Sequence, residues 1–379
     1  MGMKDDVQQE YEELKNHFKK TSFDDFRSGD WFSTFVQWML TEYAKQVDAD
    51  YLRRKYPGAG ARNQAKKAVD LASKYAGVAG GASAAAVTGL ELAGLGPQAI
   101  VAVPAIGAAV MADIGFTTRL QLRTTYDLSV LHRAPLCLDD AEDCYLIFMT
   151  ALGIKLSEVA GGFVKAVGPQ IVQYNMRRFL RNGFRAALVE IIKKVAGSAI
   201  ARKLTEKAIL RVLVPGISIP ISASANYAFT RSMLKVANKQ MQRRGYIIEP
   251  LLKLYSVEKD FPRDFVVQSL IVMMESPRRE GWDEEQMNSL RQTQSFLALS
   301  DAQVSALENW FDRTAADLAA SLPKMDSRVA AALVEFLARC AALGDPSGDA
   351  AYSQAIEKIA RAIHVDDIPS ISHARTAAA

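Results

Sequence analysis

The chain has few of the residues that most often carry chemistry or disulfides. Its 379 residues include three cysteines and four histidines, with no CxxC pair and no histidine pair at metal-ligand spacing. An odd cysteine count argues against a disulfide framework and favours a reducing compartment. There is no P-loop and no HExxH, and at 216–220 a proline stands where a nucleophile elbow needs glycine. We therefore predict a protein that is not an enzyme and needs no cofactor.

Strand signals are also scarce, because runs of alternating β-branched residues are nearly absent. Apolar residues instead recur at helical spacing, most regularly over 171–195. The fold class predicted is all-α, a helical bundle with a central Gly/Ala-rich apolar hairpin, plus a second, smaller all-α domain. The first residues are charged and carry no apolar segment of the kind found in secretory signals, which favours a cytoplasmic location.

One long segment, 75–112, is almost free of charge, with Glu91 as its one charged residue. Its second part is interrupted by Pro97 and Pro104. Small residues at strict four-residue spacing fall on one face of a helix, where two backbones can approach closely. In this segment those residues are Gly77, Gly81, Ala85 and Gly89. The pattern predicts two helical arms that form a hairpin.

The sequence leaves open whether this hairpin contacts lipid or a protein core. About 20 apolar residues suffice to span a bilayer, but Ala and Gly add little transfer free energy, and a proline inside a helix costs about 3 kcal/mol. Stable spanning, peripheral or re-entrant association, and a soluble core all stay open. Lysines before the hairpin and arginines after it would place both ends in the cytoplasm if it inserted. The candidate membrane-contact residues are Gly77, Gly81, Ala85, Gly89, Leu92, Ile100, Val103, Ile106 and Val110.

The net charge of +4 hides a strong asymmetry along the chain. Segment 161–244 holds sixteen Lys and Arg against two Glu, a net charge of +14, whereas 245–379 has a net charge of −7. Such a basic segment is typical of contact with an anionic surface or with an acidic part of the same chain. Nucleic acid is disfavoured because no recognition helix, RNP motif or zinc finger accompanies the charge. The candidate anionic-surface residues are Arg177, Arg178, Arg181, Arg185, Lys193 and Lys194.

Changes in composition divide the chain into four predicted parts. The residues 1–60 read as an N-terminal helical arm, and 61–245 as a helical domain that contains the hairpin and the basic segment. Residues 246–365 are acidic and regularly helical, with helix N-caps predicted at Ser300 and Asp326. The helices predicted here are 247–254, 261–274, 283–299, 300–322, 327–342 and 350–363. We predict that 366–379 is a disordered tail.

The order of features over residues 31–245 resembles a known family. A basic pair precedes the apolar hairpin, a proline-bearing arm leads to an acidic residue, and a polar helix follows before a proline-bracketed segment. The residues that carry this order are Lys66, Lys67, Pro97, Pro104, Asp113, Leu120, Gln121, Tyr126, Asp127, Pro215, Pro220 and Asn226. In this order the chain is similar to the EcsC family of bacterial proteins. The resemblance implies membrane association rather than a defined activity.

Residues 246–363 resemble the TerB-like helical fold, which often has an acidic Asp-Gly turn at a helix start. Gly344-Asp345 stands near the second of these turns, and an acidic turn around Gly281 stands at the first. The resemblance implies a divalent metal site whose candidate ligands are Glu280, Glu284 and Glu285. Both turns depart from the family pattern, so we expect no bound metal here.

Together these patterns predict a non-catalytic scaffold or regulator of a bacterial membrane or envelope-stress system. It would dock on the inner face of the cytoplasmic membrane through the hairpin and the basic segment, and the acidic part would recruit a protein partner. A soluble helical protein–protein interaction module is the first alternative, and a cryptic hydrolase or toxin-like effector with a pocket beneath 215–226 is the second. The sequence leaves the protein partner and self-association open.

Overall fold

The computed structural model describes residues 43–45, 47–57, 60–93, 99–136, 143, 147, 218–276, 284–311 and 313–378. All regular elements in these ranges are helices and none is a strand, which confirms the predicted all-α fold. The described residues fall into two compact units. The first comprises the described residues up to 131, Ile147 and 218–239; the second comprises 132–136, Asp143 and 240–378.

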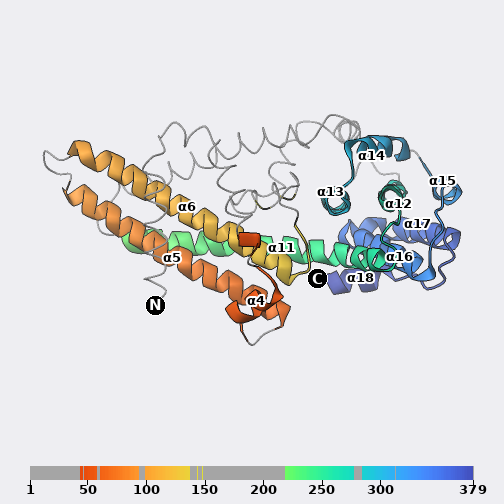
Figure 1. Cartoon of the computed structure of the whole chain (residues 1–379), viewed down its shortest axis with the longest axis horizontal. Coiled ribbons are helices and arrows are strands. Elements are labelled where there is room, and N and C mark those ends of the chain that lie inside the picture. The colour runs from red at the N-terminus through yellow and green to blue at the C-terminus, as the bar shows by residue number, and fades with distance from the viewer. Residues whose placement is uncertain are drawn as a thin grey trace. The chain divides into compact units, whose positions relative to one another are not determined.

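The first unit is built on a helical hairpin. Helix α5 (Ala61–Ala93) and helix α6 (Ala99–Leu131) lie side by side, as Figure 1 shows, and the short helix α4 (Ala49–Lys55) packs against α6. The predicted apolar hairpin is therefore present, and α6 runs without a break through Pro104. Among the described helices, none combines the length and apolar character needed to cross a membrane.

The interior of the hairpin is made largely of small side chains. Residues spaced three or four apart share one face of a helix, and this face of α5 is buried. On α6 the larger side chains of Phe116, Leu122 and Leu128 complete the core. The buried apolar side chains described on α5 are five alanines and one valine, Ala65, Ala68, Val69, Ala72, Ala76 and Ala79.

Helix α11 (Ser218–Val257) supplies residues to both units. The sequence predicts a domain boundary between residues 245 and 246, where the charge changes sign. The units instead divide between residues 239 and 240, inside α11. The helix itself continues through the change in composition and through Pro250. A change in surface charge does not interrupt backbone hydrogen bonding, so it is a poor marker of a helix end.

The second unit is a bundle of helices around one apolar core. Helix α12 (Arg263–Glu275) is its most buried element, with nine of its thirteen residues buried. The helices α16 (Ser327–Leu343) and α17 (Asp349–Ala362) pack on α12 and on each other. The remaining elements are α13 (Glu284–Leu297), α14 (Asp301–Ala306), η1 (Leu307–Trp310), α15 (Ala315–Ala320), η2 (Pro346–Gly348) and α18 (Ile371–Ala378).

Local capping explains where several of these helices begin. The predicted N-caps are confirmed, because the side chain of Ser300 accepts from the backbone N–H of Gln303 and that of Asp326 accepts from Arg328. The single helix predicted over 300–322 is wrong. It is split into α14, η1 and α15, and Thr314 begins α15 with a capping box of its own.

The end of the chain differs from the disordered tail that the sequence predicts. Residues Ile371–Ala378 form helix α18, which packs on α16. The side chains of Ile371 and Ala374 are buried in the core of the second unit, and Arg375 pairs with Asp349 at 2.6 Å. Two apolar residues three positions apart are a weak helical pattern in the sequence. A helix this short is stable only because it packs against α16.

Candidate functional site

The most elaborate polar cluster of the first unit surrounds the carboxylate of Asp127 on α6. Asp127 is fully buried, so its charge needs partners. Its Oδ1 accepts a hydrogen bond from the hydroxyl of Tyr43 at 2.8 Å. Its Oδ2 accepts from the ammonium of Lys55 at 2.7 Å and from the hydroxyl of Tyr56 at 2.8 Å. Three donors from residues 43–56 thus fasten this segment to α6.

The fold of α4 brings these donors together. Asp48 caps the helix by accepting from the backbone N–H of Tyr51 at 2.6 Å. The helix then ends with Lys55 in its last turn and Tyr56 at its C-cap, so that two consecutive side chains reach the same carboxylate oxygen. A basic residue in a last turn also suits the negative end of the helix dipole.

Three tyrosine rings surround the ammonium nitrogen of Lys55. The Nζ atom lies 5.3 Å from the ring centroid of Tyr43, 5.2 Å from that of Tyr51 and 5.4 Å from that of Tyr56. It also donates to the hydroxyl of Tyr43 at 2.7 Å. The distances to Tyr51 and Tyr56 are those of cation–π contacts, whereas Tyr43 meets the ammonium through its hydroxyl, near the plane of its ring. We call Tyr43, Tyr51, Tyr56 and Asp127 the tyrosine cage.

The electrostatics of the cage keep its phenols protonated. Burial, followed by the negative charge of Asp127, raises the pKa of Tyr43 and of Tyr56 far above the ordinary value for tyrosine. Both hydroxyls therefore remain hydrogen-bond donors over the whole physiological range of pH. The arrangement can hold a cation firmly, and it offers neither an activated nucleophile nor a base of the kind that hydrolysis requires.

A second feature of the first unit is the close contact of α5 with α11. A Cβ atom added at Gly77 would lie 3.3 Å from Cβ of Tyr227, and one added at Gly81 would lie 3.6 Å from Cβ of Ala223. The sequence predicts lipid contact for Gly77 and Gly81, whereas the structure places both against α11, because the absence of side chains lets the helices approach.

The other predicted hairpin residues lie on α5 and α6 by their backbone positions. Ala85, Gly89 and Leu92 are on α5, and the remaining four are on α6. Those four are Ile100, Val103, Ile106 and Val110.

The solvent-facing side of α5 is basic. Arg62, Lys66, Lys67 and Lys74 are all exposed, and the one acidic residue among them, Asp70, lies 3.1 Å from Arg231 of α11. Lys66, Lys67 and Lys74 fall within about 100° of one another around the helix axis and so share a face. This α5 basic face lies on the side of the helix away from the buried alanines.

The six candidate residues of the anionic surface lie outside the described residues. They are Arg177, Arg178, Arg181, Arg185, Lys193 and Lys194. Their prediction stands on the sequence alone.

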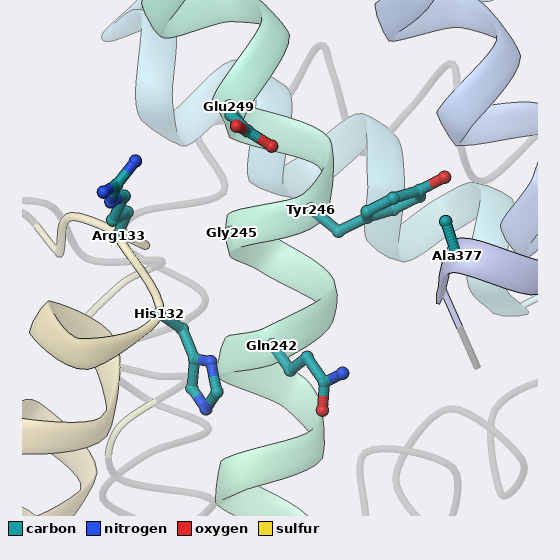
Figure 2. Close-up of a pocket in the computed structure, with 7 residues that line it drawn as sticks. All are labelled: His132, Arg133, Gln242, Gly245, Tyr246, Glu249 and Ala377. Atoms are coloured by element: carbon teal, nitrogen blue, oxygen red, sulfur yellow. The ribbon is translucent and has the colours of Figure 1, made fainter. Parts of the chain in front are cut away.

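The second unit contains a cavity of about 210 Å³ beside α11 (Figure 2). Gln242, Tyr246 and Glu249 line it from α11, and His132 and Arg133 line it from the segment after α6. Arg339 donates to the carboxylate of Glu249 at 2.8 Å, and this hydrogen bond lowers the pKa of Glu249. With Arg133 and Glu249 both in its lining, the cavity carries both signs of charge. The lining includes no serine, cysteine or threonine and so does not strengthen the hydrolase alternative.

Gly245 allows the close approach of the two segments that form this cavity. A Cβ atom added at Gly245 would lie 2.0 Å from the carbonyl oxygen of His132, which belongs to the backbone and cannot rotate away. Replacing Gly245 with alanine is therefore expected to lower the free energy of unfolding by about 1–3 kcal/mol, the usual cost of overpacking. Urea unfolding measures the effect. Gly60→Ala is the matched control because nothing lies within 4 Å of a Cβ there, and equal losses in both variants would contradict the close contact.

The candidate metal ligands are not brought together as a site in the described part of the chain. Glu285 pairs with Arg243, and Glu284 begins α13, whereas Glu280 lies outside the described residues. Across the ranges that the structure describes, no group of three His, Cys, Asp or Glu side chains could hold a metal ion.

Sequence reasoning missed most of the tyrosine cage. The resemblance to the EcsC family drew attention to Asp127, but Tyr43, Lys55 and Tyr56 lie 71–84 residues away from it. The only local signal was three tyrosines and two lysines within the fourteen residues 43–56. Comparisons of the chain with models of known families, with curated proteins and with solved structures found no match.

Proposed function

We propose that the chain is a non-catalytic scaffold or regulator that docks on the inner face of the bacterial cytoplasmic membrane. In this proposal the first part is EcsC-like and contacts an anionic lipid surface, while the second part is TerB-like and recruits a protein partner. The system served would be one of the membrane or the envelope-stress response. The observation that carries the proposal is the α5 basic face, which lies beside the apolar hairpin.

The charges of this face are available for an external partner. Lys66 and Lys74 are exposed on α5, and the one acidic residue between them, Asp70, is already engaged by Arg231. Lys67 differs, because it donates to the carbonyl of Pro57 at 2.7 Å. A basic residue near an anionic membrane contributes about 1 kcal/mol of binding free energy, so a few such residues beside an apolar segment support peripheral attachment.

The double variant Lys66→Gln, Lys74→Gln tests this attachment. We expect it to lose about 2 kcal/mol of binding free energy, or roughly 30-fold in affinity, for vesicles that contain anionic lipid. Co-sedimentation with vesicles at low salt measures the change. The control is Lys324→Gln, Lys358→Gln, which removes two exposed charges from the second unit and should bind like the unchanged chain. Equal affinities for both double variants would reject the α5 basic face as the docking surface.

The candidate anionic-surface residues predicted from the sequence give a second test of the same docking. Neutralising Arg177, Arg181 and Arg185 together should also weaken binding to anionic vesicles, by an additive amount if both surfaces contact lipid at once. Unchanged binding would confine the docking surface to other parts of the chain.

One observation favours the first alternative, a soluble module for protein–protein interaction. Gly77 and Gly81 pack on α11, so part of the small-residue face belongs to a protein interior. If the chain bound no vesicle of any charge, the α5 basic face would serve an acidic protein instead. The hydrolase alternative would gain support only from turnover of an ester or amide substrate.

A further inference from the structure

We propose that the tyrosine cage is a binding site for the ammonium group of a ligand, and that Lys55 is an exchangeable resident of this site. The inference rests on the geometry around one nitrogen atom and is independent of membrane docking. The ligand class is a primary or quaternary amine, either free in solution or carried by a lipid headgroup.

The first argument is the number of groups that converge on the cation. The rings of Tyr51 and Tyr56 lie 5.2 and 5.4 Å from the Lys55 nitrogen, which also donates to the hydroxyl of Tyr43 at 2.7 Å. A single cation–π pair is common in proteins, but a cage of several rings is the arrangement used to recognise quaternary ammonium ligands.

The second argument is that the cage does not depend on Lys55 for its own assembly. The hydroxyls of Tyr43 and Tyr56 donate to different oxygens of Asp127, both at 2.8 Å. The hydroxyl of Tyr51 lies 3.3 Å from that of Tyr43, and their rings pack edge to face. When the ammonium leaves, two rings therefore stay anchored to a fixed negative charge, and the third stays packed on the first.

The third argument concerns access to the site. The side chain of Lys55 is 30% exposed, whereas that of Asp127 is fully buried. Lysine has a flexible stem and a strongly hydrated head, so it can turn into water while the carboxylate stays in place. The guanidinium of Arg123 lies 4.9 Å from the ring centroid of Tyr43 and would hold that ring during the exchange.

The exchange predicts how binding should depend on Lys55. The apparent affinity of a site is its intrinsic affinity multiplied by the fraction of time that the site is open, so the resident lysine must weaken ligand binding. The unchanged chain should bind choline weakly, because Lys55 occupies the site for most of the time. Lys55→Ala should bind it at least about tenfold more tightly, and Tyr51→Ala at least about tenfold more weakly.

The experiment is a calorimetric titration of the full chain with choline, and with 3,3-dimethyl-1-butanol as its uncharged isostere. Saturable binding of choline but not of the isostere, tightened in Lys55→Ala and lost in Tyr51→Ala, would support the proposal. Lys55→Met, which keeps most of the apolar stem, replaces Lys55→Ala if that variant does not fold. Binding by the Lys55 variants but not by the unchanged chain would overturn the exchange, and so would no binding by any of them.

A competition arm separates the two sources of the amine. Vesicles with ethanolamine headgroups and no net charge are added to the choline titration. Displacement of choline would assign the site to a lipid headgroup, and failure to displace it would assign the site to a free amine. Vesicle binding through the α5 basic face is measured separately, so its failure would leave the choline result unaffected.

Discussion

Replacing Arg244 with methionine is expected to lower the free energy of unfolding by about 3–5 kcal/mol, as the loss of one partner from a buried ion pair does. Only 1% of the Arg244 side chain is exposed, and its guanidinium lies 2.8 Å from Oδ1 of Asp143. The same group donates to Oδ2 of Asp143 and to the carbonyl of Pro135, both at 3.0 Å. Without it, the fully buried carboxylate of Asp143 would lose its cationic partner, while the hydrogen bond from Ser295 at 2.8 Å would remain.

Urea unfolding followed by circular dichroism measures this loss. The matched control is Arg328→Met, because Arg328 pairs with Asp326 on the surface with 73% of its side chain exposed, and such pairs contribute at most about 1 kcal/mol. The double variant Arg244→Met, Asp143→Leu should recover much of the stability, since an apolar pair can replace a buried ion pair. A loss in Arg244→Met no larger than that of the control would contradict the burial of this pair.

Replacing Asp127 with asparagine is expected to cost about 3 kcal/mol of unfolding free energy, because three donors meet at this one carboxylate. An asparagine side chain has nearly the same shape but one acceptor oxygen, and its amide group would face a donor. Tyr43 and Tyr56 would then compete for one oxygen, and Lys55 would lose its counter-ion.

The comparison for Asp127→Asn is Tyr56→Phe, which removes one of the three donors and keeps the ring. Its expected cost is about 1 kcal/mol, the usual net value of one hydrogen bond. Both variants are compared by urea unfolding of the full chain. If Asp127→Asn were no less stable than Tyr56→Phe, the carboxylate would not be the centre of the cluster.

Local patterns in the sequence predicted the helices of the second unit well. The predicted segments 261–274, 283–299, 327–342 and 350–363 correspond to α12, α13, α16 and α17, whose ends lie within two residues of the prediction. Capping residues and helical periodicity are local signals, so they can be read without knowing the fold. The break before α15 had such a signal too, in the capping box from Thr314 to Asp317.

The two main polar clusters could not be predicted in the same way. Asp143 reads in the sequence as part of an acidic turn, yet its partner Arg244 is 101 residues away. The donors to Asp127 are similarly distant from it in the chain. Pairing across such separations depends on how the helices pack, and neither periodicity nor spacing encodes it in a single sequence.

Fractionation of cells that contain the native protein tests the proposed membrane docking most directly. The membrane pellet is washed with high salt and then with alkaline carbonate. We predict that the protein sediments with membranes and that high salt releases it, because docking through basic residues is electrostatic and is screened by salt. Retention through carbonate would indicate insertion of residues 75–112 instead. Full recovery in the soluble fraction at low salt would contradict membrane docking and leave the protein-interaction module as the better account.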